Sequence, residues 1–221
     1  MGAQTLSGAL QSAPQISILW KIVDAGERLA AAALLVVLLP LLALSAFLVA
    51  VLSRRSPWIA HRRVGQHGQS IWVMKLRTMW SSGASQPPKF QLLERFEAGT
   101  LPEPKTPADA RVTSPFAAWC RKYSIDECPQ FWHVVRGEMA LIGPRPLTAT
   151  EIEMHYGLDS VELLSRKPGI TGLWQIKGRS RLTYPQRRRL DLFLIRRWSL
   201  GLYMKVLFDS IPRILTGRDA W

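Results

Sequence analysis

The most hydrophobic stretch of the chain lies near its N-terminus, at residues 29–52. It contains no charged residue, and Ser45 is its only polar side chain. A run of about 18 or more apolar residues is long enough to cross a bilayer as a helix. The stretch is too long for the hydrophobic core of a cleaved signal peptide, and no clear small-residue cleavage site follows it. The pattern therefore predicts a membrane helix.

Basic residues flank this helix on both sides, with Lys21 and Arg28 before it and Arg54, Arg55, Arg62 and Arg63 after it. Because basic flanks favour the cytoplasmic side, both ends are expected there. Pro40 lies near the middle, where it removes a backbone donor and favours a bend. A re-entrant helix that bends at Pro40 within residues 21–55 fits both observations. A spanning helix with a mild kink is the alternative.

The segment after the membrane helix combines a short strand with a long loop. Residues 71–76 form an apolar run typical of a strand. Prolines recur between residues 81 and 113, which indicates a surface loop around one short helix near residues 90–98.

Capping signals then predict two helices. Ser114 is a suitable N-cap and Pro115 a suitable first residue for a helix that ends at residue 122. Ser124 and Glu127 have the spacing of a capping box, which predicts that a second helix begins there and ends at Gly137.

The C-terminal half is predicted to be mainly helical. Helices are expected at residues 147–156 and 160–166, and a short strand at residues 173–176. From Pro185 onward, apolar and basic residues alternate at helical spacing, which suits a membrane interface or an ordinary protein core. The predicted fold class is α+β, mostly helical. It comprises an N-terminal tail (1–20), a re-entrant membrane helix (21–55) and a cytoplasmic domain with short strands and interfacial helices (56–221).

Charge narrows the class of partner. The chain has 29 Lys and Arg against 16 Asp and Glu, a formal net charge of +13, so its partners should be anionic. The membrane helix favours anionic membrane lipid and phosphorylated substrates, and no nucleic acid partner is expected. Cys120 and Cys128 lack the paired spacing of zinc sites or disulfide frameworks and are interpreted as reduced core residues.

Acidic residues are scarce, and Asp126 and Glu127 stand together at a predicted helix start. Arg121, Lys122 and Arg136 lie near them in the sequence. Neighbouring cations and a helix N-terminus keep a carboxylate ionised, which suits a nucleophile or a Mg²⁺ ligand. Ordinary helix capping is the alternative interpretation of both residues.

Basic residues in turns are candidates for phosphate binding. Arg145 lies in the sequence GPRP, and Arg179 in KGR. Arginine presents a planar fork that matches phosphate oxygens, and adjacent glycine lets a ligand approach the backbone. Lys75 and Arg77 alternate along a strand and should share one face. Solvated turns and a solvent-facing strand edge are the alternatives.

Four ordered motifs resemble those of the bacterial sugar transferases, also called monotopic phosphoglycosyl transferases. They are RRVGQHGQSIWVMKLRTM (62–79), ARVTSPFAAWCRKYSIDECPQFWHVVRGEMALIGPRPL (110–147), KPGITGLWQIKGRS (167–180) and RRWSLGLYMKVL (196–207). The resemblance extends over about residues 20–221. It departs from the family pattern at Leu76, Cys128, Glu138 and Pro115-Phe116, and a thiol beside the acidic pair suggests sensitivity to alkylation.

The resemblance implies an enzyme with a re-entrant membrane helix and a two-step reaction. Asp126 would attack the sugar-bearing phosphorus of a UDP-sugar, releasing UMP, and polyprenyl (undecaprenyl) phosphate would then accept the sugar phosphate. Glu127 would assist Asp126 in binding Mg²⁺ or in handling protons. The substrate-binding residues implied are Lys75, Arg77, Arg121, Arg145 and Arg179.

The same resemblance implies a place for the enzyme in the cell. The catalytic domain would lie on the cytoplasmic face of the bacterial inner membrane and begin assembly of an exopolysaccharide, O-antigen or glycoprotein glycan, with downstream glycosyltransferases as further partners. The sugar is not identified, and residues that contact it are expected in the loop at 81–110. Two alternatives stay open: a sequential Mg²⁺-dependent transferase without a covalent intermediate, and a non-catalytic membrane-bound module that binds anions.

Overall fold

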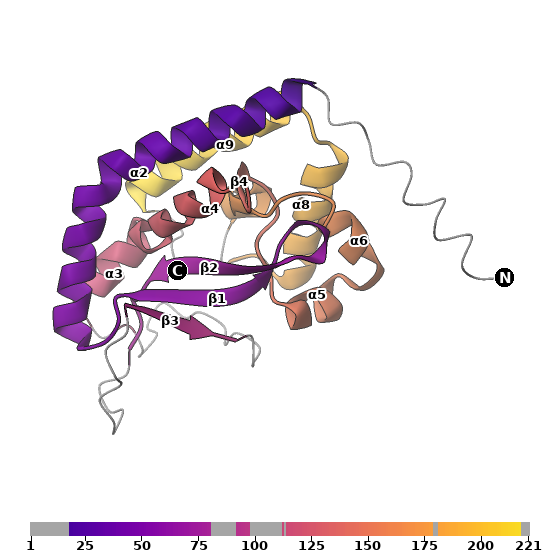
Figure 1. Ribbon diagram of the computed structural model, residues 1–221. Helices are drawn as coiled ribbons and strands as arrows, with labels where there is room; N and C mark the ends of the chain where they lie inside the picture. The colour runs from indigo at the N-terminus through magenta and orange to yellow at the C-terminus, as the bar shows by residue number, and fades with distance from the viewer. Residues whose placement is uncertain (1–17, 81–91, 98–111, 113, 179–180, 218–221) are drawn as a thin grey trace.

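The computed structural model describes residues 18–80, 92–97, 112, 114–178 and 181–217. The fold is mostly helical, as predicted, and contains two small sheets. Its longest element is helix α2 (Ile18–Ser53), which lies across the top of the molecule in Figure 1. This helix includes the predicted apolar run. It remains helical across Pro40 and changes direction along its length (Figure 1), as a helix with an internal proline commonly does.

The larger sheet has the strand order β2-β1-β3. Strand β1 (Trp58–Val64) pairs antiparallel with β2 (Ser70–Leu76), with Trp58 opposite Leu76 and Val64 opposite Ser70; the short helix η1 (Gln66–Gly68) lies in the turn. The predicted strand at residues 71–76 is confirmed.

Strand β3 (Leu93–Phe96) pairs parallel with β1, so the predicted helix near residues 90–98 is wrong. Contacts between distant residues explain the difference. Glu94 forms a 2.7 Å ion pair with Arg77, and the Arg95 guanidinium lies over the ring of Trp72. Such tertiary contacts override the local helical preference of a four-residue segment.

The smaller sheet joins β4 (Ala140–Ile142) to β5 (Gly169–Thr171) in parallel. The predicted strand at residues 173–176 is wrong, because Leu173–Lys177 form helix α7 and the strand lies just before it. Leu173, Trp174 and Ile176 are buried in this helix. A short apolar run looks the same in a buried strand and in a buried helical turn, so periodicity alone did not distinguish them.

Helix α3 (Pro115–Lys122) is capped as predicted, since the Ser114 hydroxyl accepts a hydrogen bond from Ala117 N at 3.0 Å. The predicted capping box after it is wrong. Ser124 has φ +57° and makes no capping hydrogen bond, and a 3-10 helix, η2 (Ile125–Gln130), follows it. The Glu127 side chain pairs with Lys75 instead. Helix α4 (Phe131–Val135) then ends near Gly137, whose φ of +74° suits a glycine, as predicted.

The remaining helices follow the predicted order. They are α5 (Ala149–His155), η3 (Gly157–Asp159), α6 (Ser160–Leu163), α8 (Tyr184–Arg196) and α9 (Leu200–Thr216). Helix α5 has a complete capping box between Thr148 and Glu151, and Ser199 caps α9.

Both halves of α2 pack against the rest of the molecule. Near its start, Trp20 and Val23 join the cluster around Tyr203 and Val206 of α9. Near its end, Leu42, Ala46 and Val49 pack with Leu76, Cys120 and Ile125. The α2 residue Glu27 is buried and accepts hydrogen bonds from Leu141 N (2.9 Å) and the Tyr203 hydroxyl (2.6 Å).

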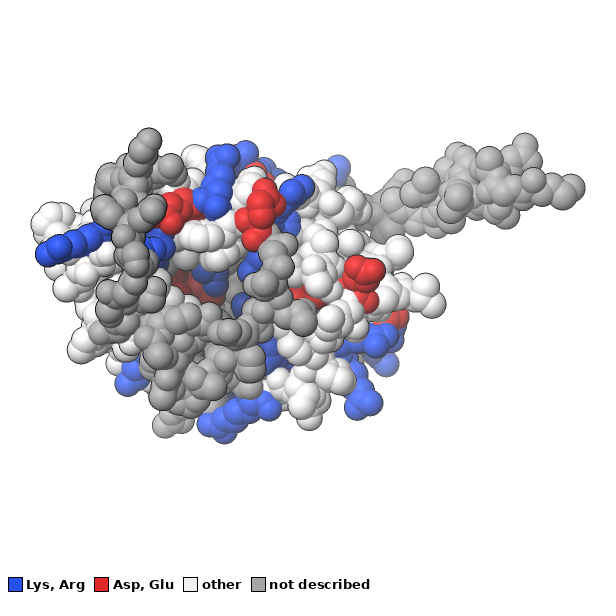
Figure 2. Space-filling model, turned by 90° about the horizontal axis from the view of Figure 1, so that it is seen from below, with Lys and Arg blue, Asp and Glu red and all other residues white. Residues whose placement is uncertain are grey.

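The outward surface of α2 is apolar. Its exposed residues include Leu29, Val36, Val37, Leu39, Phe47 and Val51, and α9 adds Phe208 and Leu215. The face turned away from α2, seen in Figure 2, shows basic and acidic side chains instead. Among the described residues, α2 is the one helix long and apolar enough to cross a membrane.

Candidate active site

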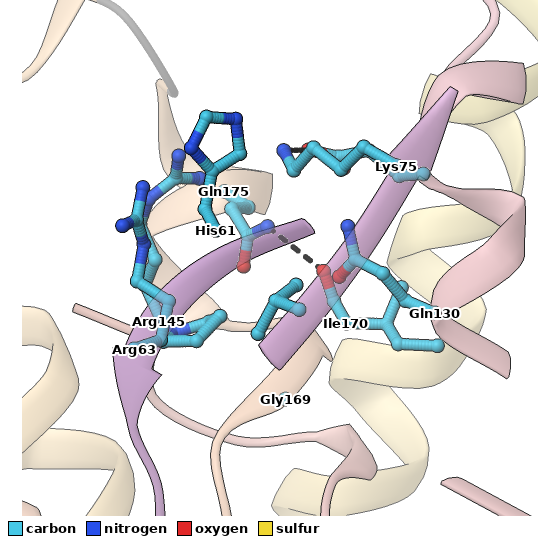
Figure 3. A pocket seen from close by; sticks show the side chains of 11 residues that line it. His61, Arg63, Lys75, Gln130, Arg145, Gly169, Ile170 and Gln175 are labelled. Atoms are coloured by element: carbon cyan, nitrogen blue, oxygen red, sulfur yellow. Dashed lines mark hydrogen bonds and ion pairs between the residues drawn. The ribbon is translucent and has the colours of Figure 1, made fainter. Parts of the chain in front are cut away.

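Residues of three of the four sequence motifs, together with His61, converge on one pocket (Figure 3). It lies between the larger sheet, η2, the GPRP turn and the start of α7. The lining residues are His61, Arg63, Val73, Lys75, Glu127, Gln130, Arg145, Pro146, Gly169, Ile170 and Gln175. His61, Arg63 and Arg145 lie on one side of the pocket in Figure 3, and Lys75 and Gln130 on the other.

Close contact between two glycines positions the GPRP turn. A Cβ atom built on Gly169 would lie 2.1 Å from the backbone nitrogen of Gly143, and one built on Gly143 would lie 2.7 Å from that of Gly169. Gly169 N donates to the carbonyl of Pro144 at 2.8 Å. The two backbones can touch because neither residue has a side chain, and Arg145 is thereby held at the pocket.

Three cationic side chains face this pocket. Arg63 lies on β1, Lys75 lies on β2, and the guanidinium of Arg145 lies 5.6 Å from the ring centroid of Trp174. Burial lowers the pKa of Arg63, and the charge of Arg145 lowers it further. Cations held this close together, with part of their hydration removed, favour binding of a multiply charged anion.

The two predicted catalytic acids lie beside these cations. Lys75 Nζ is 2.7 Å from Glu127 Oε1, and both side chains are mostly buried. Asp126 precedes Glu127 in η2 and is half-buried, but it is not among the residues that line the pocket. Successive residues of a 3-10 helix point about 120° apart, so the two carboxylates point in different directions.

His133 connects the sheet to the helices that follow η2. Its Nε2 accepts a hydrogen bond from Met74 N at 3.1 Å, and its Nδ1 lies 2.6 Å from Glu138 Oε2. Because Nε2 accepts, Nδ1 is the nitrogen that carries the proton and donates to Glu138. Glu138 also pairs with Arg136 at 2.9 Å. This chain of contacts holds the strand that presents Lys75.

The structure brings some of the predicted substrate-binding residues together and separates others. Lys75 and Arg145 line the pocket. Arg77 does not: it is buried, its Nε donates to the Ser56 carbonyl at 2.7 Å, and it pairs with Glu94. Arg121 lies on α3 outside the pocket lining, and its Nε is buried and has no hydrogen-bond partner in the part of the chain that the structure describes. Arg179 lies outside the described residues.

Four polar pocket residues were not predicted: His61, Arg63, Gln130 and Gln175. The alternation of His61 and Arg63 along a strand was the signal that could have found two of them, because residues i and i+2 share one face of a strand. Gln175 depends on the position of α7, and its side-chain amide donates to the Ile170 carbonyl at 3.0 Å.

The two thiols are less reactive than the sequence suggested. Burial, and then the nearby charge of Asp126, raise the pKa of Cys120 to about 12 and that of Cys128 to about 11. The thiolate is the form that reacts with alkylating agents. The raised pKa of Cys128 argues against its expected sensitivity to alkylation, and both cysteines are free, as predicted.

A membrane-type helix packed on a small domain, with a basic pocket beside a pair of carboxylates, defines a class of protein that handles anionic substrates next to a membrane. Comparison with known proteins identifies the family within this class. Residues 19–217 match the family model described as bacterial sugar transferase. The chain belongs to this family and is a phosphoglycosyl transferase, which excludes the non-catalytic module considered above.

Three relatives illustrate the match. The exopolysaccharide production protein ExoY of Rhizobium meliloti (strain 1021) is 36% identical over 197 residues, which cover 88% of this chain and 86% of the relative. The undecaprenyl-phosphate galactose phosphotransferase of Salmonella typhimurium is 35% identical over 73% of this chain and 34% of its own length. The undecaprenyl-phosphate glucose phosphotransferase of Komagataeibacter xylinus is 33% identical over 85% of this chain and 35% of its own length.

Proposed function

We propose that the protein transfers a sugar 1-phosphate from a UDP-sugar to undecaprenyl phosphate and releases UMP, as the first membrane step of exopolysaccharide or other glycan assembly. The observation that supports this best is the pocket itself, where Arg63, Lys75 and Arg145 lie with Glu127, the residue that follows Asp126 in η2. A phosphorylated donor and a phosphorylated lipid both need such cations. The names of the three relatives agree with this chemistry.

In the proposed reaction, an Asp126 carboxylate oxygen attacks the phosphorus that bears the sugar. The bond from this phosphorus to the bridging oxygen breaks, UMP leaves with that oxygen, and an aspartyl phosphosugar remains. An oxygen of undecaprenyl phosphate then attacks the same phosphorus, which restores the carboxylate and forms a lipid diphosphate sugar. In both steps an anionic oxygen attacks the phosphorus of a negatively charged phosphate group. The nearby guanidinium and ammonium groups lower the barrier because they partly neutralise the charge of that group.

Glu127 and Lys75 have a structural role in this scheme. Their ion pair keeps Lys75 pointed at the pocket and offsets the charge of Glu127 beside the attacking carboxylate. Because both groups are mostly buried, replacing Glu127 would remove this ion pair from the Lys75 ammonium in the site.

Magnesium fits the donor set at η2. Among the described residues no group of three or more His, Cys, Asp or Glu could enclose a metal ion. Mg²⁺ is usually held by one or two carboxylates together with water and substrate phosphates, so a single carboxylate from Asp126 or Glu127 would suffice. Bound there, the ion would neutralise phosphate charge.

We further propose that α2 is a re-entrant membrane helix and that the domain lies on the cytoplasmic face of the inner membrane. Residues near both ends of α2 contact the same domain, through Trp20 and Tyr203 at one end and Val49 and Leu76 at the other. A helix that crossed the bilayer would carry one of these ends to the opposite side, beyond reach of the domain. Anionic lipid headgroups suit the basic flanks of the helix, and downstream glycosyltransferases would use the product.

Intact-protein mass spectrometry tests the chemistry. The purified enzyme is incubated with Mg²⁺ and a panel of UDP-sugars without lipid acceptor. We expect a mass increase of one sugar phosphate in the wild type and in the matched control Asp209→Asn, which alters an exposed residue of α9, but none in Asp126→Asn. UMP release that requires undecaprenyl phosphate, with no adduct from any donor, would support the sequential mechanism and overturn Asp126 as nucleophile.

A further inference from the structure

At the edge of the pocket, the larger sheet brings together two rings from distant parts of the sequence. His61 of β1 lines the pocket, and its ring stacks on Phe96 of β3 with centroids 5.4 Å apart and 26° between the planes. Phe96 is held in turn by Arg77, whose guanidinium lies 6.0 Å from the ring centroid. The stacked pair therefore rests on Arg77, which Ser56 and Glu94 fix in place.

The His61 imidazole is neutral at physiological pH. Its pKa is lowered to about 4, first by burial and then by the charges of Arg63, Lys75 and Arg77. A neutral imidazole offers one N–H donor and one acceptor nitrogen. Within the described part of the chain no residue forms a hydrogen bond with either ring nitrogen, so both can serve a ligand.

The chemistry of His61 differs from that of its neighbours in the pocket. Arg63, Lys75 and Arg145 are cations that suit phosphate oxygens, whereas a neutral donor and acceptor suits hydroxyl groups. Lys75 interacts with both His61 and the acidic pair. It forms an ion pair with Glu127, and its charge lowers the pKa of His61. The sugar is attached to the phosphorus that Asp126 would attack, so a phosphosugar held by Lys75 would place its sugar in the pocket that His61 also lines.

We propose that His61 forms hydrogen bonds with hydroxyl groups of the transferred sugar and that Phe96 positions the His61 ring. The two residues would then form a sugar-specificity subsite, an inference that rests on the proposed function. Phe96 belongs to the segment 81–110, where sugar-contacting residues were expected from the sequence. Most of that segment lies outside the described residues, and strand β3 is the part that the structure pairs with β1, where Phe96 stacks on the pocket residue His61.

Steady-state kinetics with two donors that differ at one hydroxyl, UDP-glucose and UDP-galactose, test this subsite. UMP, which lacks the sugar, serves as a competitive probe of the nucleotide site. In His61→Leu we expect kcat/KM for the better donor to fall roughly 10- to 100-fold, as for loss of one or two hydrogen bonds. The value for the poorer donor should fall less than about threefold, and the Ki of UMP should stay unchanged.

Two further variants separate recognition from folding. His61→Gln keeps one donor and one acceptor and should retain most of the discrimination between donors. Arg62→Gln changes the neighbouring residue, which is bonded to Ser70 and Glu97, and should leave the kinetics unchanged.

Three results would overturn the subsite. An equal fall for both donors with weakened UMP inhibition would place His61 at the nucleotide. An unchanged donor ratio in His61→Leu would show that the ring does not contact the differing hydroxyl. If the wild type transferred phosphosugar from no UDP-sugar to undecaprenyl phosphate, the proposed function would itself fail, and the subsite with it.

Discussion

Asp191 of α8 is the most deeply buried carboxylate near the pocket. Its side chain is 1% exposed, Oδ2 accepts a hydrogen bond from the Tyr156 hydroxyl at 2.8 Å, and Oδ1 has no hydrogen-bond partner among the described residues. Burial raises its pKa to about 7, although the charges of Arg145 and Arg187 oppose the shift. An acid with a raised pKa binds a proton more tightly in the folded state, so it stabilises the fold below its unfolded pKa, near 4, and loses this contribution as pH rises through about 7.

We expect Asp191→Asn to flatten the pH dependence of stability between pH 4 and 7. One titrating group changes the free energy of unfolding by at most about 1.4 kcal/mol per pH unit. Thermal unfolding in detergent at pH 5, 6 and 7.5 measures this. The Tm of the wild type should fall more steeply with pH than that of Asp191→Asn, while the exposed control Asp209→Asn should keep the wild-type slope. Equal slopes in all three proteins would contradict the assignment.

At the scale of elements, the pairing of β4 with β5 decides where Arg145 lies. The two strands are only three residues each, and the contact between Gly143 and Gly169 sets their separation. The same strands adjoin α7, so Trp174 comes to lie under the guanidinium of Arg145. A small displacement of these two strands would move Arg145, the proposed phosphate-binding side chain, without changing any proposed catalytic group.

Gly169→Ala is expected to destabilise the protein by at least about 1–3 kcal/mol, as overpacking does, and to lower activity because the GPRP turn must move. The added Cβ would meet Gly143 N at 2.1 Å and Thr171 O at 2.6 Å, which are backbone atoms that cannot rotate away. Gly201→Ala is the matched control, since its Cβ would meet nothing within 4 Å. Denaturant unfolding and turnover of both variants check this, and a stable, fully active Gly169→Ala would contradict it.

At the scale of the whole molecule, α2 joins the apolar surface to the catalytic pocket. Its outward face is exposed and apolar, and its inner face packs on α3, η2, α4 and α9. The proposed lipid acceptor and the proposed water-soluble donor can therefore meet at one site only if the domain stays at the membrane surface.

Single cysteines placed at the two ends of α2 test the re-entrant topology. We expect Lys21→Cys and Arg55→Cys both to react with a membrane-impermeant maleimide in inverted vesicles and neither to react in intact spheroplasts. The wild type provides the blank, because the raised pKa values of Cys120 and Cys128 slow their reaction. If one position reacted only in inverted vesicles and the other only in intact spheroplasts, α2 would be a spanning helix instead.

The sequence by itself determined the features that depend on neighbouring residues. The length of the apolar run defined α2, Ser114 and Pro115 defined the start of α3, and Gly137 defined a helix end. Each feature follows from interactions between neighbouring residues. These are the free-energy cost of exposing apolar side chains to water and the need for hydrogen bonds at the first N–H and last C=O groups of a helix. The candidate groups Lys75 and Arg145 were also predictable, because cationic side chains suit phosphate, and Glu127 was predictable because a carboxylate suits a metal ion.

Only the tertiary structure decided features that depend on contacts between distant residues. Strand β3 replaced a predicted helix because β1 offered it backbone partners, and Glu127 left the predicted capping box because Lys75 lies 52 positions away in sequence but 2.7 Å away in space. The same folding placed Arg77 outside the pocket and brought His61 and Arg63 into it. Such pairings depend on the free energy of the whole fold, in which a buried ion pair or a strand contact outweighs a weak local preference.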